Sequence, residues 1–477
     1  MNTVYFDIGD TLRYSRSNRT LTGIQRFVTQ AIIHLVNKYG LDRIKLIAYH
    51  PRKKRLVCYD ASYFLGEFDF DRNCFLHHFG VRRQFLIPPK LVSYVDDKYG
   101  SRWKDLISAG LLLKNLLSGG RTFRKNGIAI TWPEKPAAPV DADIQLKPGD
   151  IIFVGGAPWG ALPFYTELQR LRQSRGVHVC HYIHDLIPIV APQYCVSKLS
   201  KKFGNWLTMM VDQSDYLLTN SVASAKDLHQ WLADKGVLID VGVVRLAHQF
   251  ADKSREYIDL GRVSNRVRNE ARLPYALCVG TLDARKNIWT LANVWMEVHA
   301  RLGVATPRLI FAGKSGGMKE DFDAFIKATG SLYGYIRIID GPSDDELVYL
   351  YRNCLFSIYP SYIEGWGLPI GECLWFGRPV ICSNTSSMPE VGGDLADYVD
   401  PTRPETILQA VLRMIEDVDY RERRAAQISR AHLRSWTDFA EDLWRELSKI
   451  SSANVFSGAN PMNIPCYSQK DCDAANA

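Results

Sequence analysis

A strand, a glycine-rich loop and the start of a helix follow one another between residues 354 and 377, and this order constrains the fold strongly. Residues 354–360 are apolar and end in a proline, which is typical of a buried strand. Residues 373–377 continue a helical run. In α/β proteins, the amides of such a loop and the positive end of the helix dipole face an anionic ligand together. The segment therefore predicts an α/β domain with an anion site after this strand.

Two glutamates, Glu364 and Glu372, lie in this segment with seven residues between them. Glu372 is expected in the helix, where its carboxylate can accept hydrogen bonds from a ribose. Glu364 is expected in the loop, closer to the phosphates, so the pair indicates a bound sugar nucleotide. The alternative is a helix start whose acidic residue complements the dipole, followed by a second, solvated glutamate.

Residues 364–394, EGWGLPIGECLWFGRPVICSNTSSMPEVGGD, resemble the E-x7-E region of retaining glycosyltransferases of family 4, which have the GT-B fold. The resemblance is strongest over residues 275–400. It implies an α/β protein of two Rossmann-like domains whose parallel sheets face each other across a cleft. It also implies that the loop contacts the donor diphosphate through residues Gly365, Trp366, Gly367 and Leu368.

The segment GTLDARKN, residues 280–287, begins at the end of an apolar strand. A diphosphate needs compensating cations, and Arg285 offers a bidentate fork beside the point charge of Lys286. Both can also stabilise the charge that grows on a leaving diphosphate. Cations at a helix start oppose the dipole, which favours a ligand over a solvated basic pair. In the family a matching segment holds the donor diphosphate, so Gly280 and Thr281 are expected to contact it too.

Two segments of the first half resemble cleft residues of the same family. His184 ends a strand in an H-D pair, and the resemblance places it beside the donor sugar, although a lone histidine at a strand end is usually structural. Residues 22–26 resemble the T-G-I-x-R loop of the family. Gly23 would let the backbone approach the sugar or diphosphate, and Arg26 could reach a phosphate. The alternative is an ordinary helix cap by Thr22.

Strands alternate with helical segments along the chain, which indicates parallel α/β architecture. Residues 1–255 are expected to form an N-terminal acceptor-binding domain, with an irregular insertion at about residues 60–145. Residues 256–432 are expected to form the nucleotide-sugar-binding domain. A final helix over residues 433–450 should pack back towards the N-terminal domain. Residues 451–477 are rich in small and polar residues and are expected to be disordered.

The composition, 46% hydrophobic and 23% charged over 477 residues, is that of a globular protein. The net charge of +8 suits an anionic nucleotide or membrane surface and indicates no nucleic-acid-binding arm. The ten cysteines form no CxxC or Cys/His metal pattern, which favours free thiols in a reducing cytoplasm. Residues 106–117 form an apolar stretch with a basic flank. They could lie on the inner membrane surface or form a core helix, and the core helix is favoured.

Two other motifs point to different chemistry. Residues 6–12, FDIGDTL, resemble the nucleophile motif of haloacid-dehalogenase-type phosphatases, but those enzymes usually carry a second acid where Gly9 stands. The D-x-D metal motif of the other major glycosyltransferase fold occurs at residues 69–71, 141–143 and 321–323, but none clearly ends a strand of a nucleotide-binding unit. The sequence therefore predicts no metal and keeps the phosphatase as a remote alternative.

The resemblance implies a retaining, metal-independent hexosyltransferase with no cofactor besides its nucleotide-sugar substrate. GDP-mannose is favoured as the donor, with rhamnose or glucose donors as alternatives. The acceptor is expected to be a glycan or lipid-linked glycan in polysaccharide or lipopolysaccharide assembly, at the cytoplasmic side of the inner membrane. The catalytic candidates are Glu364, His184, Arg285 and Lys286, and the alternative is a non-catalytic module that binds a sugar nucleotide or a glycan.

Overall fold

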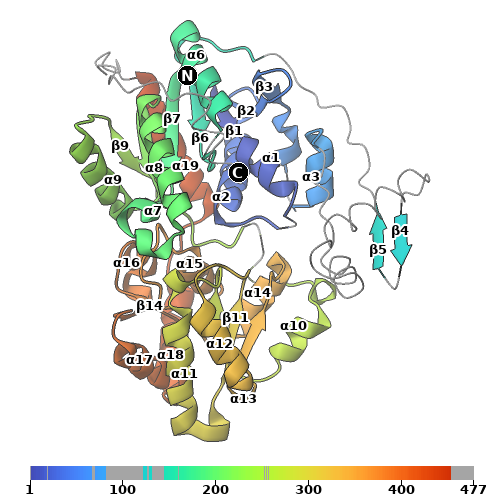
Figure 1. Cartoon of the computed structure of the whole chain (residues 1–477), viewed down its shortest axis with the longest axis vertical. Coiled ribbons are helices and arrows are strands. Elements are labelled where there is room, and N and C mark those ends of the chain that lie inside the picture. The colour runs from blue at the N-terminus through green and yellow to red at the C-terminus, as the bar shows by residue number, and fades with distance from the viewer. Residues whose placement is uncertain are drawn as a thin grey trace.

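The computed structural model describes residues 2–18, 20–66, 70–81, 122–125, 128–131, 144–159, 161–251, 253, 255 and 257–452. These residues form two α/β domains, which Figure 1 shows one above the other. Each domain is built on its own sheet, and the apolar runs of the sequence form the strands of both sheets.

The N-terminal domain has a seven-stranded sheet that is parallel except at one edge, where β3 runs antiparallel to β2. The first strand lies inside the sheet, because Val4 pairs with Ile44 on one side and with Ile151 on the other. In spatial order the strands are β3 (Arg55–Tyr59), β2 (Ile44–His50), β1 (Val4–Asp7), β6 (Ile151–Val154), β7 (His178–Ile183), β8 (Tyr216–Thr219) and β9 (Val241–Val243).

Both faces of this sheet are buried, as a parallel sheet requires. Neighbouring residues of β1 enter different cores: Phe6 packs in one apolar cluster and Tyr5 in another. The helices of the domain are α1 (Gly9–Ser15), α2 (Gly23–Tyr39), α3 (Arg72–His78), α6 (Leu162–Arg175), α7 (Ile187–Val190), α8 (Ser197–Asp212) and α9 (Val222–Lys235).

The C-terminal domain has a six-stranded, fully parallel sheet. Its strands are, in spatial order, β12 (Ile336–Ile339), β11 (Arg308–Ala312), β10 (Tyr275–Val279), β13 (Phe356–Tyr359), β14 (Val380–Ser383) and β15 (Asp397–Val399). The chain order reverses between β10 and β13, and in such sheets ligands bind beyond the carboxyl ends of the strands at this point.

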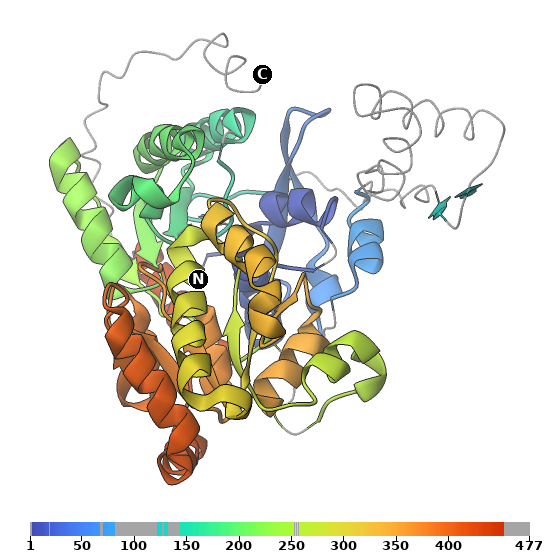
Figure 2. The same ribbon diagram turned by 60° about the horizontal axis from the view of Figure 1, so that its bottom comes forward.

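The helices of the C-terminal domain lie on both sides of its sheet, and Figure 2 brings them forward. Trp295 of α11 and Ile407 of α17 belong to one buried cluster, whereas Ile370 of α15 belongs to another. These helices are α10 (Asn265–Glu270), α11 (Ile288–Leu302), α12 (Glu320–Ala328), α13 (Gly330–Tyr333), α14 (Asp344–Asn353), α15 (Leu368–Trp375), α16 (Met388–Gly392), α17 (Pro404–Glu416) and α18 (Val418–Arg430).

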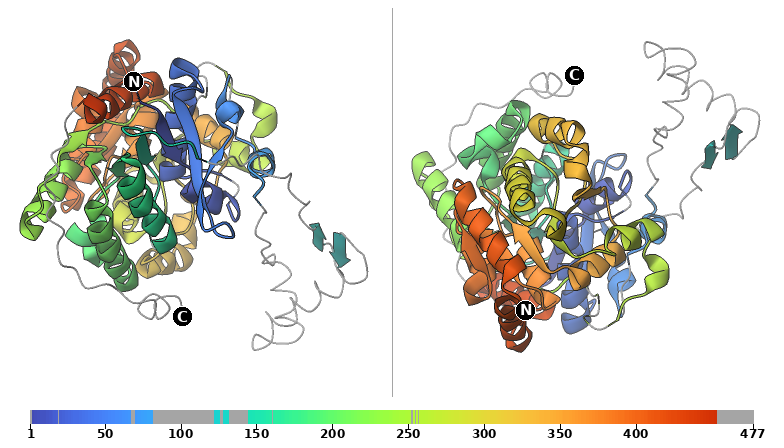
Figure 3. Two further views of the ribbon diagram at one scale, coloured as in Figure 1. Left: turned by 90° about the horizontal axis from the view of Figure 1, so that it is seen from above. Right: turned by 90° about the horizontal axis from the view of Figure 1, so that it is seen from below.

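The last helix, α19 (Trp436–Ser452), returns to the N-terminal domain and packs on α2. The rings of Tyr39 and Trp444 stack with their centroids 4.3 Å apart, and Lys38 pairs with Glu441. Figure 3 shows α19 beside the N-terminal segment from above and from below. The two domains are therefore linked at two places along the chain, by the segment after β9 and by the segment before α19.

The predicted insertion at about residues 60–145 begins with more regular structure than expected. A 3-10 turn (Ala61–Phe64) and α3 bury Phe64, Phe75 and Phe79 in the core of the N-terminal domain. Strands β4 (Thr122–Lys125) and β5 (Ile128–Thr131) form an antiparallel pair that lies apart from the two large sheets in Figures 1 and 2.

Residues 106–117, the apolar stretch predicted to form a core helix or to lie on a membrane surface, lie outside the described residues, as do residues 453–477 of the predicted tail. Within the described part of the chain, none of the helices is long and apolar enough to cross a lipid bilayer.

Candidate active site

Glu364 is the centre of a buried charged cluster at the carboxyl ends of β10 and β13. Its Oε2 lies 2.6 Å from Nη1 of Arg285, and its Oε1 lies 2.6 Å from Nζ of Lys286. The hydroxyl of Tyr359, the last residue of β13, donates to Oε1 at 3.0 Å. Arg285 is further oriented because Nη1 also donates to the carbonyl oxygen of Ile363 at 2.9 Å. The structure thus brings together three of the four predicted catalytic residues.

The charges of this cluster are set by the competition between burial and pairing. Burial opposes ionisation of Glu364, but Arg285 and Lys286 outweigh it and lower the pKa of Glu364 to about 2. For Lys286 burial prevails, and it lowers the pKa of the ammonium despite the neighbouring carboxylate. Glu364 is therefore an anion at neutral pH, and its carboxylate is shared by two cations.

Gly313 and Gly316 lie in the loop after β11 and have no room for a side chain. Gly280 follows β10 with φ of +142°, and a Cβ at Gly313, after β11, would lie 1.9 Å from the carbonyl oxygen of Gly280. Thr281 continues the Gly280 loop and packs against Gly316, where a Cβ would lie 2.8 Å from Cγ2 of Thr281. The strand ends of β10 and β11 are thus held in close backbone contact next to Lys286.

Helix α15 begins directly after the loop of Glu364 with an open N-terminus. Gly367 is its N-cap, with φ of +106° in the left-handed region, and supplies no side chain to the first amides. Trp366 is buried, and its indole N–H has no hydrogen-bond partner among the described residues; Leu368 is the first residue of the helix. A helix start of this kind is able to bind an anion.

Glu372 lies in α15, as predicted, but its carboxylate already has two partners. Nη1 of Arg26 donates to Oε1 and the hydroxyl of Tyr351 donates to Oε2, both at 2.8 Å. Arg26 belongs to the N-terminal domain, and its Nη2 also pairs with Asp344 at 2.8 Å. The structure therefore places Arg26 on two carboxylates of the C-terminal domain, and its predicted phosphate contact remains a proposal.

His184 faces the Glu364 loop from the end of β7. Its Nε2 donates to the carbonyl oxygen of Gly155 at 2.8 Å, which places the proton of the neutral ring on Nε2. Burial lowers the pKa of His184 to about 4, so the ring is neutral at neutral pH. The backbone of His184 meets Gly365 so closely that a Cβ on Gly365 would lie 2.2 Å from the carbonyl oxygen of His184.

Gly23 also lies at the domain interface, where a Cβ would stand 3.5 Å from Cδ1 of Leu368. The predicted residues of both halves therefore meet around the loop of residues 363–368. His181, in contrast, is buried in the N-terminal core and bonds to Ser214 at 2.8 Å.

The structure describes parts of the motifs of the two alternative chemistries. Asp7 is buried at the end of β1, and burial raises its pKa to about 7, which does not suit the ionised nucleophile of a phosphatase. Asp321 and Asp323 lie in the first turn of α12, while the D-x-D at 141–143 and Asp69 are outside the described residues. Among the described side chains, no group of three or more His, Cys, Asp or Glu residues is arranged to hold a metal ion.

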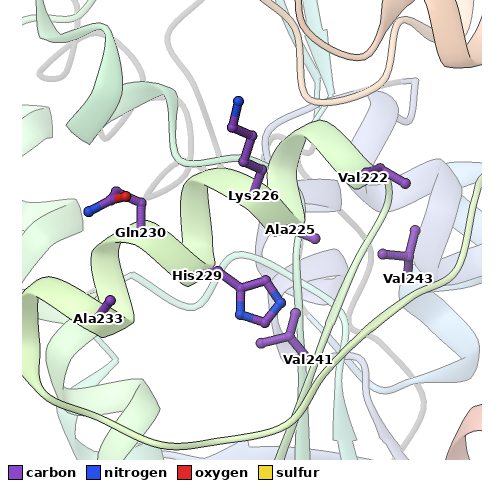
Figure 4. A pocket seen from close by; sticks show the side chains of 8 residues that line it. All are labelled: Val222, Ala225, Lys226, His229, Gln230, Ala233, Val241 and Val243. Carbon is purple, nitrogen blue, oxygen red and sulfur yellow. The ribbon is translucent and has the colours of Figure 1, made fainter.

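A groove of about 580 Å³ lies away from the charged cluster, between α9 and β9 (Figure 4). The described residues that line it include the basic side chain of Lys226 but no carboxylate, and none of them is a predicted site residue. The lining consists of Val222, Ala225, Lys226, His229, Gln230, Ala233, Val241 and Val243. An anionic ligand such as a diphosphate needs compensating cations, and the Glu364 cluster brings two of them together.

Sequence reasoning missed Tyr359, Tyr351 and Asp344. Tyr359 could have been found, since it is the last residue of a buried strand at the edge of the sheet where ligands bind. Tyr351 and Asp344 lie in α14 and reach Glu372 and Arg26 through tertiary contacts alone. No local pattern distinguishes them from other residues of an amphipathic helix.

Known proteins resemble this chain in sequence and in fold. Residues 261–432 match the family model of the glycosyl transferases group 1. Over 163 residues the chain is 36% identical to the O-antigen chain mannosyltransferase B of Escherichia coli, and over 408 residues it is 24% identical to the serotype-specific mannosyltransferase WbdA of the same species. These matches cover 34% and 80% of this chain but 42% and 48% of the relatives, so the chain spans less than half of the length of either.

Solved structures resemble both domains together. The chain superposes on sucrose-phosphate synthase from Thermosynechococcus elongatus with a TM-score of 0.58 at 14% identity, covering 95% of this chain and 100% of the other. For HepE from Anabaena, solved with UDP and glucose, the TM-score is 0.54 at 12% identity, with 94% and 100% covered. The chain therefore has the GT-B fold, and its residues 261–432 are similar to the glycosyl transferases group 1.

Proposed function

We propose that this protein transfers a hexose, in the first place mannose, from a nucleotide-sugar donor to a hydroxyl of a growing glycan. The observation that carries the proposal is the convergence of Arg285 and Lys286 on Glu364 at the switch point of the C-terminal sheet. Mannose is favoured because the relatives with matched sequence are mannosyltransferases of O-antigen chains. The acceptor is then a glycan or lipid-linked glycan of polysaccharide or lipopolysaccharide assembly, handled at the cytoplasmic side of the inner membrane.

The donor diphosphate would bind to Arg285 and Lys286, with the open start of α15 as a further anion contact. Without a ligand, the two cations share the carboxylate of Glu364. An arriving diphosphate would supply further negative charge to both cations, and Glu364 would then be released to contact the donor sugar. Gly280 and Thr281 would border the diphosphate, because they lie at the end of β10 next to the Lys286 side chain. GDP-mannose is the donor that we favour.

Glu372 would hold the ribose, but only through a rearrangement of its present partners. Because Arg26 and Tyr351 occupy both oxygens, a ribose hydroxyl must share Oε1 or Oε2 with them or displace one. We expect Arg26 to move towards the incoming phosphates, since a buried guanidinium that leaves a carboxylate needs another anion.

Transfer begins as the bond between C1 of the sugar and the diphosphate oxygen breaks. Arg285 and Lys286 stabilise the charge on the leaving diphosphate, and the anionic Glu364 stabilises the positive charge that develops at C1. The acceptor oxygen bonds to C1 from the face that the diphosphate leaves, so the configuration is retained. The hydroxyl proton passes to the leaving phosphate. Neutral His184 borders the donor sugar and does not act as an acid at neutral pH.

A thermal-shift measurement with GDP, UDP and dTDP and their sugar conjugates, without added metal, tests the donor site. A nucleotide at about 100 times its Kd should stabilise the folded protein by about 2.7 kcal/mol. The Lys286→Met variant should lose this shift. The control Lys449→Met should keep it, since Lys449 pairs with Glu446 on the surface of α19.

A transfer assay with the stabilising donor then tests catalysis. Turnover with a mannosyl donor supports the proposal. If no nucleotide raised the Tm of the wild-type protein, the donor site would be wrong. A nucleotide that binds tightly, with no transfer to any glycan acceptor, would instead favour the non-catalytic binding module.

A further inference from the structure

The carboxylate of Glu390 caps a helix of the opposite domain. Glu390 lies in α16 of the C-terminal domain, and its Oε2 and Oε1 accept the backbone N–H groups of Val222 and Ala223, both at 2.9 Å. These are the first amides of α9 in the N-terminal domain, and Figure 4 shows Val222 in the first turn of this helix. The first amides of a helix have no partner within it, and a carboxylate there also meets the positive end of the dipole.

The same end of α9 holds the loop that carries Glu364. The hydroxyl of Ser221, the N-cap of α9, donates to the carbonyl oxygen of Gly365 at 2.8 Å. The hydroxyl of Ser224 lies 3.3 Å from this oxygen and 3.4 Å from the carbonyl oxygen of His184. One helix start thus contacts the backbone beside Glu364 and the backbone of His184.

Glu390 is tied to this loop within its own domain as well. Oγ of Ser387, the N-cap of α16, lies 2.9 Å from the carbonyl oxygens of both Glu364 and Trp366, and its one proton is shared between them. The Glu364 loop and α16 therefore move as one hydrogen-bonded unit. Arg245, which follows β9 in the N-terminal domain, also pairs with Glu390, because its Nε lies 3.4 Å from Oε2 of the carboxylate.

We propose that Glu390 is a positioning residue that clasps the two domains together and sets the Glu364 loop against His184. Its bonds with α9 form only when the domains are closed, because the carboxylate and the amides belong to different domains. In the open protein both are hydrated, so the clasp favours closure without touching the donor. The proposal rests on the proposed function, since closure matters for transfer from a donor that is protected from water.

Two substitutions remove the clasp from its two sides. Glu390→Ala removes the acceptor. Val222→Pro removes one donor and leaves the helix start intact, because proline is favoured at the first helical position. Ser221, the preceding residue, has φ of −151° and ψ of 157°, an extended conformation that a following proline allows. If one of the two variants fails to fold, the other still tests the clasp.

We expect Glu390→Ala to lower kcat on the order of tenfold or more, because two charge-assisted hydrogen bonds are lost. The Kd of the stabilising nucleotide should stay within about twofold, since that site lies in the C-terminal domain. Val222→Pro should give a smaller loss of kcat, and the double variant should be no worse than Glu390→Ala, because the two residues act through one contact.

Small-angle scattering provides a readout that does not depend on activity. The radius of gyration of free Glu390→Ala should exceed that of the wild-type protein. The control is Asp417→Ala, because Asp417 caps α18 within one domain by accepting the N–H of Tyr420 at 2.8 Å. This control should lose some stability but keep the wild-type radius of gyration and kcat.

An unchanged radius of gyration together with an unchanged kcat in both Glu390→Ala and Val222→Pro would overturn the proposal. Additive losses in the double variant would also overturn it. If the wild-type protein transferred no sugar from any donor, the proposed function would fail, and the scattering comparison would still decide whether Glu390 closes the domains.

Discussion

At the scale of single residues, Glu364 shows how a buried carboxylate becomes a stable anion. Burial alone would favour the neutral acid, yet Arg285 and Lys286 lie within 2.6 Å of its two oxygens and reverse the balance. The carboxylate keeps the two cations at fixed places in the absence of a diphosphate. Under the proposed function, the site would be organised before the donor arrives, which would reduce the cost of ordering it on binding.

The pH dependence of stability should reveal this carboxylate. The pKa of Glu364 is about 2 in the folded protein against 4.5 ordinarily, so the unfolded chain binds more protons between these values. The stabilisation by Glu364 is complete above about pH 4.5 and is lost as the pH falls towards 2. We expect the difference in free energy of unfolding between wild type and Glu364→Gln to shrink over this range, as measured by urea unfolding at a series of pH values.

A comparison with Asp323→Asn controls for the general effect of acid, because Asp323 is half exposed in its pair with Lys319. That variant should differ little from the wild-type protein at any pH. If the difference for Glu364→Gln were the same at pH 5 and at the lowest pH at which the protein still folds, the carboxylate would not be stabilised in the way the structure indicates.

At the scale of elements, the loop of residues 363–368 depends on a residue without a side chain at its centre. Gly365 fits between the end of β7 and the start of α9, and its carbonyl oxygen accepts from Ser221. Sequence reasoning identified this loop from its glycines and the following helix. It attributed those glycines to ligand contact, whereas Gly365 also packs against the other domain.

Gly365→Ala should displace the loop or separate the domains. The new Cβ would meet the carbonyl oxygen of His184 at 2.2 Å and Cβ of Asp185 at 2.8 Å, and the first of these is a backbone atom at the end of β7. We expect transfer activity to fall strongly, with the nucleotide shift less affected. Enzyme kinetics and thermal shifts on the same preparation measure both effects.

Gly204→Ala in α8 is the matched control, since a Cβ there would stand 3.5 Å from Cδ1 of Ile189, an ordinary contact. This variant should be more stable by about 0.5–1 kcal/mol, because alanine loses less entropy in a helix than glycine. Full activity of Gly365→Ala would show that the loop adapts and that the close approach of the domains is not required.

At the scale of the whole molecule, charged contacts between the domains define the closed arrangement. Arg26 reaches from α2 to Glu372 and Asp344 of the C-terminal domain, and Lys314 of that domain reaches Tyr14 and Asn18. The guanidinium of Arg26 also lies over the ring of Phe250, with Cζ 4.6 Å from the ring centroid. The two domains are thus held together by polar side chains, and such side chains can exchange their partners for a ligand.

Arg26→Met should destabilise the protein in the absence of donor. The carboxylate of Glu372 is only 5% exposed, and removal of one partner of a buried pair costs about 3–5 kcal/mol. Arg26→Met combined with Glu372→Gln should recover part of the loss, because neither charge is then left unpaired. Urea unfolding of the single and double variants measures the coupling between the two residues.

The exposed pair of Lys38 and Glu441 between α2 and α19 is the control, and Lys38→Met should change stability little. Equal losses for Lys38→Met and Arg26→Met would contradict the buried role of Arg26.

The sequence by itself determined the local architecture of the site. The strand, loop and helix that carry Glu364 and Glu372 could be predicted because apolar runs, glycines and prolines act on the backbone within a few residues. The same holds for Arg285 and Lys286 at the end of β10, and for the alternation that builds the two sheets.

Only the tertiary structure decided which charges meet. Arg26 and Glu372 are 346 residues apart, and Glu390 and Val222 are 168 apart. Among 51 acidic and 59 basic residues, no local pattern selects these partners. The choice follows from the way two separately folded sheets come together, which fixes distances between side chains that the periodicity of the chain does not encode.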